Sequence, residues 1–186
     1  MTRFAWAAWG LLVVVLDLPL LGWDVVPDVV GYAWLVIGLG GSAALHPAFV
    51  RARAAAAVGV PLSVVTGTPL FFGARWEPLL FGALVLGFLV WAGVVHQLLT
   101  GLLAVAPAGE EDSLRWAPAL RVAAPVVALV AVIGVAASSS ALGVLYPLGF
   151  VASVVVGILT VVLLHRVNRA GWFTDVAPPP PRATAQ

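Results

Sequence analysis

Long apolar stretches alternate with short polar segments along most of this chain. The apolar stretches cover residues 4–22, 28–46, 54–73, 78–100, 121–142 and 144–165. A helix that crosses the hydrocarbon core of a bilayer needs about 20 mostly apolar residues, and each stretch is close to that length. The pattern therefore predicts an all-α fold, an integral membrane bundle of about six transmembrane helices within residues 1–169.

The last residues, 170–186, break this pattern. They are more polar and contain four consecutive prolines, Pro178–Pro181. Such a run favours an extended polyproline II conformation over a packed helix. We expect a disordered, proline-rich tail on the cytoplasmic side.

The arginines predict the orientation of the bundle. Positively charged residues gather in cytoplasmic loops of membrane proteins. With the N-terminus inside, only Arg75 falls on the outer side, and the inner side holds the other eight: Arg3, Arg51, Arg53, Arg115, Arg121, Arg166, Arg169 and Arg182. We therefore expect both termini to be cytoplasmic and the protein to reside in the plasma membrane of a bacterium.

The composition supports the lipid environment and excludes several chemistries. The chain is 62% hydrophobic and 9% charged, with a mean hydropathy of +1.10, whereas a soluble domain carries about 25% charged residues. It has no Cys and no Lys, which excludes thiolate and Schiff-base catalysis. No G-x-S-x-G motif is present either, so we expect a non-enzymatic protein. The net charge of +1 and the lack of a basic run argue against nucleic acid as a partner.

Acidic residues gather on the predicted outer side. Asp24 and Asp28 lie in the first outer turn and Glu77 in the second, where water can solvate them. Asp17 differs because it lies about 20 Å along the first helix at 1.5 Å per residue. A carboxylate at such a depth is costly unless it faces a wet cavity or a partner. The alternative is that Asp17 caps the helix or reaches the interface.

The third apolar stretch contains two G-x-P patterns, at Gly59–Pro61 and Gly67–Pro69, with hydroxyl residues between and beside them. Proline removes a helix hydrogen bond, and interrupted helices often build the binding sites of transporters. The alternative is a kinked packing helix. The residues expected to form a substrate or ion pathway are Asp17, Thr66, Thr68, Ser138 and Arg75.

Three histidines, His46, His96 and His165, lie near the predicted cytoplasmic interface. Two of them on different helices would suit haem b, and three would suit zinc. The alternative, which we prefer, is that they anchor helix ends and that His96 bonds a neighbouring helix. We therefore expect no cofactor.

Small residues recur every four positions in the last apolar stretch, at Gly149, Ser153 and Gly157. Such faces let helices approach closely in lipid. They favour tight packing within one bundle, and a homo-oligomer or a contact with another membrane protein is the alternative.

One segment resembles a known pattern. Gly22, Trp23 and Asp24 precede two aliphatic residues, the pair Pro27-Asp28, and then the pair Gly31-Tyr32. This is similar to a segment of small multi-pass membrane proteins of Gram-positive bacteria. The resemblance covers about 20 residues of the chain and implies a helical hairpin, without implying an activity.

Three functional hypotheses follow. The outer acids and the interrupted helix favour a permease or transporter component for a small solute or ion. The small-residue faces would instead suit an assembly subunit of a larger membrane complex. The histidines would suit a haem- or metal-binding membrane subunit.

Overall fold

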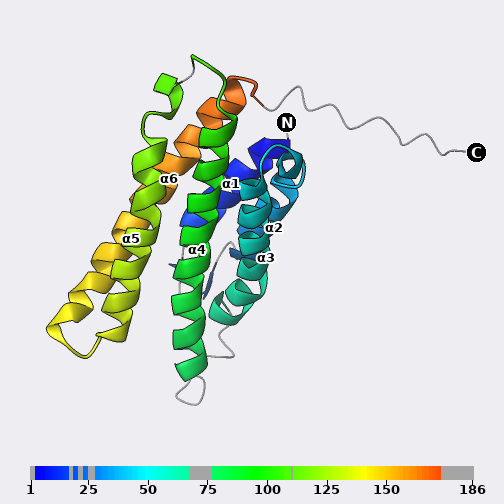
Figure 1. The fold of residues 1–186 in the computed structure, drawn as a ribbon. Coiled ribbons are helices and arrows are strands. Elements are labelled where there is room, and N and C mark those ends of the chain that lie inside the picture. The colour runs from blue at the N-terminus through cyan, green and yellow to red at the C-terminus, as the bar shows by residue number, and fades with distance from the viewer. Residues whose placement is uncertain are drawn as a thin grey trace, which may run out of the picture.

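The computed structural model describes residues 3–16, 19–20, 23–24, 28–67, 77–109 and 111–172, and these ranges form an all-α fold (Figure 1). The helices are α1 (Arg3–Leu16), α2 (Asp28–Gly38), α3 (Pro47–Gly67), α4 (Glu77–Val105), α5 (Ala117–Ala136) and α6 (Leu145–Arg169). Short 3-10 turns lie between them at η1 (Ser42–Ala44), η3 (Glu111–Leu114) and η4 (Ala141–Val144).

Two very short strands lie between α1 and α2. They are β1 (Pro19–Leu20) and β2 (Trp23–Asp24), which pair antiparallel with Pro19 opposite Asp24. The pairing reverses the chain direction, so α1 and α2 form a hairpin.

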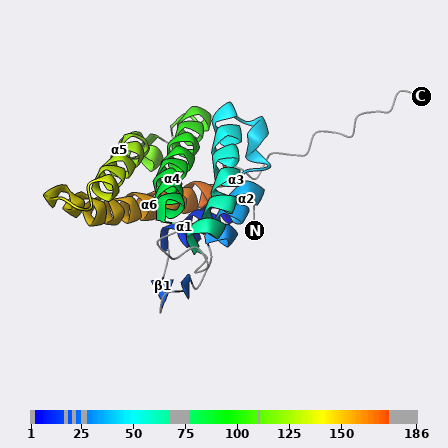
Figure 2. The same cartoon turned by 90° about the horizontal axis from the view of Figure 1, so that it is seen from below.

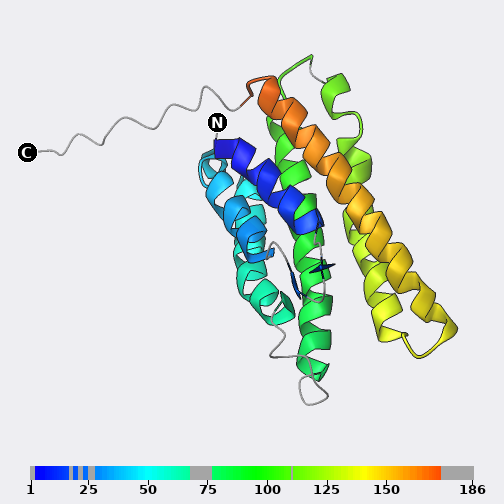
Figure 3. The same ribbon diagram turned by 180° about the vertical axis from the view of Figure 1, so that it is seen from behind.

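The helices form a closed ring. Each one packs against the next in the sequence, and α6 returns to pack against α1. Figure 2 shows this order from below, and Figure 3 shows α1 running beside α6. In contrast, α4 and α6 hardly touch each other.

Four helical stretches are long and apolar enough to cross a membrane: Pro47–Gly67, Pro78–Val105, Ala117–Ala136 and Ala141–Arg169. This finding supports the membrane prediction. Within the described residues, α1 and α2 are shorter apolar helices of 14 and 11 residues. At 1.5 Å per residue they extend about 21 Å and about 17 Å, less than the hydrocarbon core of about 30 Å. Six complete spans and the sides of the termini stay predictions.

Several helix boundaries differ from the predicted stretches. α1 ends at Leu16 instead of residue 22, α4 continues to Val105 instead of residue 100, and α5 spans Ala117–Ala136 instead of 121–142. α2 ends at Gly38 instead of residue 46, because Gly38, Gly40 and Gly41 weaken the helix and the chain turns through η1. α3 starts at Pro47 instead of residue 54. Pro47 suits a first helical position, and Nδ1 of His46 accepts a hydrogen bond from the Ala48 amide at 3.2 Å.

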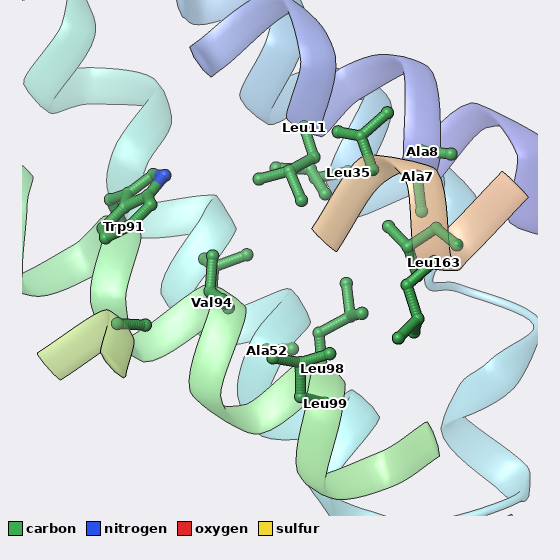
Figure 4. Close-up of a cluster of buried hydrophobic side chains, with 14 of the residues drawn as sticks. Ala7, Ala8, Leu11, Leu35, Ala52, Trp91, Val94, Leu98, Leu99 and Leu163 are labelled. Atoms are coloured by element: carbon green, nitrogen blue, oxygen red, sulfur yellow. The ribbon is translucent and has the colours of Figure 1, made fainter. Parts of the chain in front are cut away.

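The core lies in the half of the bundle that holds the N-terminus. Figure 4 shows leucines of α1, α2, α4 and α6 meeting there, with Ala7 and Ala8 on α1 and Ala52 on α3. Leu11, Leu35, Leu98 and Leu99 have no exposed surface. Trp91 lies at the edge of this cluster.

Small residues bring the helices into close contact. A Cβ atom on Gly149 would lie 2.5 Å from the backbone nitrogen of Ala131 on α5, and one on Gly157 would overlap the side chain of Val15 on α1. Ser153, between them, is buried. The three small residues of α6 therefore pack inside one chain, as the preferred interpretation expects.

Apolar side chains cover the outside of the last two helices. On α5 they are Val122, Val126, Leu129 and Ile133, and on α6 they include Leu148, Val151, Val155 and Val162. These residues are three or four positions apart, except for the seven positions between Val155 and Val162. Such spacings return to the same side of a helix, so each helix has one continuous apolar face. Such large apolar faces suit contact with lipid.

Candidate functional site

A cavity of about 180 Å³ lies between α1, α2, α3, α4 and α6. It forms where α4 and α6 separate, and its walls come from the end of α1, the start of α2 and the end of α3. The first halves of α4 and α6 supply the rest of the lining. The cavity therefore lies in the half of the bundle away from the N-terminus, beyond the leucine-rich core.

Asp28 places a carboxylate in the wall of this cavity. It is the first residue of α2, and one of its carboxylate oxygens is buried. The positive end of the helix dipole stabilises an anionic side chain at this position. Among the described residues that line the cavity, none is basic.

Three hydroxyl residues also line the cavity, Ser63 and Thr66 on α3 and Ser153 on α6. Each donates its proton to a backbone carbonyl of its own helix. Ser63 Oγ donates to Gly59 O at 3.0 Å, Thr66 Oγ1 to Leu62 O at 3.2 Å, and Ser153 Oγ to Gly149 O at 2.8 Å. The hydroxyl oxygens can still accept hydrogen bonds through their lone pairs.

Aromatic rings form the part of the wall that α4 and α6 supply. Phe88 on α4 meets Tyr146 on α6 edge to face, with centroids 6.3 Å apart, and Tyr146 lies 6.4 Å from Phe150. Trp91, one turn after Phe88, is buried and also lines the cavity. These rings come from the two helices that separate to form the space.

Tyr32 connects the part of the cavity wall that holds Asp28 to the part that holds the hydroxyl residues of α3. It lies one turn after Asp28 on α2, and its ring packs on Gly59, where a Cβ would come within 2.5 Å of the ring. Ser63 follows Gly59 by one turn on α3. Because Gly59 has no side chain, α2 and α3 can approach each other closely. Tyr32 and Ser63 therefore line the same cavity.

The structure brings only part of the predicted pathway together. Thr66 lines the cavity, whereas Ser138 lies in the exposed turn after α5 and does not line it. The predicted pathway residues Asp17, Thr68 and Arg75 lie outside the described residues.

The three residues of the predicted outer acidic turn lie on different elements of the fold. Asp24 ends β2 and Glu77 begins α4, while Asp28 lines the cavity. Sequence reasoning treated Asp28 as a solvated turn residue and did not select the four aromatic residues. A pattern could have indicated them: Phe88 and Trp91 are three residues apart and Tyr146 and Phe150 four, so each pair shares one helix face.

The histidines make separate local contacts. Nδ1 of His96 donates to Arg121 O at 3.0 Å, which joins α4 to α5, while Nδ1 of His165 donates to Val161 O at 3.1 Å within α6. His46 caps α3, as described above. In the described part of the chain no three His, Cys, Asp or Glu residues gather as a metal site would require.

Comparison with family models, with curated proteins and with solved structures finds no match for this chain.

Proposed function

We propose that the protein is a non-enzymatic permease or transporter component that binds a small solute within a cell membrane. The cavity between α1, α2, α3, α4 and α6 carries this proposal, because it combines polar groups and aromatic rings within an apolar part of the bundle. Ligand sites are typically apolar clefts with a few convergent polar groups, and in helical bundles they lie between helices.

The cavity volume limits the size of the solute. A cavity of about 150 Å³ in a helical protein accommodates benzene. The space of about 180 Å³ therefore suits a molecule of similar size. A solute held between separated helices is also the arrangement found in many transporters.

Filling the cavity tests the proposal. Gly87 lines the cavity, and a Cβ there meets no atom within 4 Å, so Gly87→Leu adds a side chain without a backbone clash. Gly82 on the same helix is equally open but lies outside the cavity lining and is exposed, so Gly82→Leu is the matched control. The probes are butylammonium, butyramide and butyrate, which share four carbons and differ in charge.

Binding is measured by isothermal titration calorimetry on purified protein, and uptake in proteoliposomes. We expect the native chain and Gly82→Leu to bind and move at least one probe, and Gly87→Leu to lose at least about tenfold in affinity. If no probe binds the native chain, or if both variants bind equally well, the cavity is not a solute site. A protein that then co-purifies in fixed ratio would favour the assembly role.

A further inference from the structure

Trp91 brings a hydrogen-bond donor to the cavity. Its side chain lines the cavity and is only 7% exposed. The indole Nε1–H can donate but cannot accept, and a buried tryptophan usually has a partner for this group. Trp91 makes no hydrogen bond to any residue that the structure describes. The cavity wall on α4 therefore holds a donor for which the described part of the chain supplies no acceptor.

Helix α3 brings acceptors to the same space. Ser63 and Thr66 line the cavity, and each hydroxyl donates its proton to a backbone carbonyl of its own helix. Ser63 Oγ has a second carbonyl, Val60 O, within 2.9 Å, which also holds its proton on the side of the helix backbone. In this arrangement the two hydroxyls offer their lone pairs to a ligand. The cavity thus presents a donor on α4 and acceptors on α3.

The spacing of the two hydroxyl residues matches the NH2 group of an amide. Residues three positions apart on a helix have Cβ atoms about 5–6 Å apart. An amide nitrogen has two N–H bonds that diverge in one plane, so two acceptors at about 2.9 Å from the nitrogen lie about 5 Å from each other. One primary amide can therefore donate to Ser63 and Thr66 together. Its carbonyl oxygen is the kind of acceptor that the indole N–H of Trp91 requires.

We propose that the cavity binds a small neutral primary amide with a short alkyl chain. The amide donates to Ser63 and Thr66 and accepts from Trp91 Nε1, while its alkyl chain packs on the aromatic rings of α4 and α6. This inference rests on the proposed function, because it assigns a substrate class to the same cavity. It does not depend on Asp28, which already has an interaction within the protein.

The three four-carbon probes differ in hydrogen bonding as well as in charge. Butyramide donates and accepts, whereas butylammonium only donates and butyrate only accepts. A fourth probe, 2-pentanone, has the shape of butyramide with a methyl group in place of the NH2 group, so it removes the donor without adding a charge. Each probe is titrated into the purified native chain in detergent, and a titration into empty micelles is subtracted. We expect butyramide to bind at least about fivefold more tightly than each of the other three.

Removing the two hydroxyls of α3 tests the acceptors. The double variant Ser63→Ala/Thr66→Val should weaken butyramide binding by roughly 5- to 100-fold and leave 2-pentanone binding within about twofold. Thr100→Val/Thr160→Val is the matched control, because each of these hydroxyls also donates to the carbonyl four residues back, at 2.8 Å, and neither residue lines the cavity. The control should bind both probes as the native chain does.

The indole signals in a nuclear magnetic resonance spectrum test the donor. Butyramide and 2-pentanone both carry a carbonyl group, so saturation with either should shift the Nε1–H signal of Trp91 downfield. Trp91→Phe identifies this signal by its loss. Trp9 is the internal control, because it packs on the ring of His165 outside the cavity lining, and its signal should not shift.

The outcomes separate the two proposals. If 2-pentanone binds as tightly as butyramide, or if butylammonium or butyrate binds best, the amide inference is wrong while solute binding in the cavity stands. The amide inference is also wrong if the double variant of α3 binds butyramide as its control does, or if the Trp91 signal does not shift. If none of the probes binds the native chain, the proposed function itself fails, and the inference fails with it.

Discussion

At the scale of single residues, His96 joins two helices through one hydrogen bond. Its Nδ1 donates to Arg121 O at 3.0 Å, which connects α4 to α5. Hydrogen bonds between membrane helices contribute about 1 kcal/mol. We expect His96→Ala to lower the free energy of unfolding by that amount, measured as a reduced melting temperature of the detergent-solubilised protein.

The neighbouring Gln97→Ala is the control for removing a half-buried polar side chain from α4. It should change the melting temperature less than His96→Ala does. A purified protein with a Soret band that disappears in His96→Ala would instead support the haem hypothesis and refute the purely structural role of His96.

Single residues also show which parts of the site a sequence can predict. Thr66 could be selected because a hydroxyl beside prolines in an apolar stretch is unusual. The sequence showed Asp28 as an acidic residue, but its place in the cavity wall depends on where α2 begins, since the first turn of this helix faces the cavity. Trp91 and Tyr146 could not be distinguished from core or lipid-facing residues, because their importance depends on the separation of α4 from α6.

At the scale of elements, the close contact between α5 and α6 depends on a glycine, which has no side chain. A Cβ on Gly149 would lie 2.5 Å from the Ala131 nitrogen, so Gly149→Ala must push the two helices apart. Overpacking of this kind costs about 1–3 kcal/mol. Gly82→Ala adds the same methyl group to an open position on α4 and should cost nothing. Melting temperatures of the two variants test this, and equal values would contradict the close packing.

The helix boundaries show what hydropathy predicts and what it does not. The lengths of the apolar stretches predicted all the long helices in the right order, because a helix needs about 20 mostly apolar residues to cross a bilayer. They placed the start of α3 too late, since Arg51 and Arg53 lower the local hydropathy. Both are exposed in the helix, and Arg53 Nε reaches Val36 O on α2 at 3.0 Å. Long arginine side chains can extend from a helix end toward the interface, so charge there does not end the helix.

At the scale of the whole molecule, the chain's lack of cysteine allows its orientation to be measured. Ser139 lies exposed in the turn between α5 and α6, and Ala108 lies exposed in the turn after α4, at the opposite end. Ala108 is preferable to Gly109, whose φ of 92° favours glycine. Because arginines predict cytoplasmic termini, a membrane-impermeant maleimide on intact cells should label Ser139→Cys and not Ala108→Cys. The reverse labelling pattern would invert the topology.

The contact between α1 and α6 has a consequence for how the molecule is made. α1 leaves the ribosome well before α6, yet Val15 of α1 packs on Gly157 of α6. The face of α1 that packs on α6 therefore stays uncovered until α6 has been synthesised. Since both helices also supply cavity walls, an unfinished chain holds no complete cavity. Ribosomes that stall before α6 would thus release fragments without this cavity, and such fragments would expose apolar surfaces that quality-control proteases recognise.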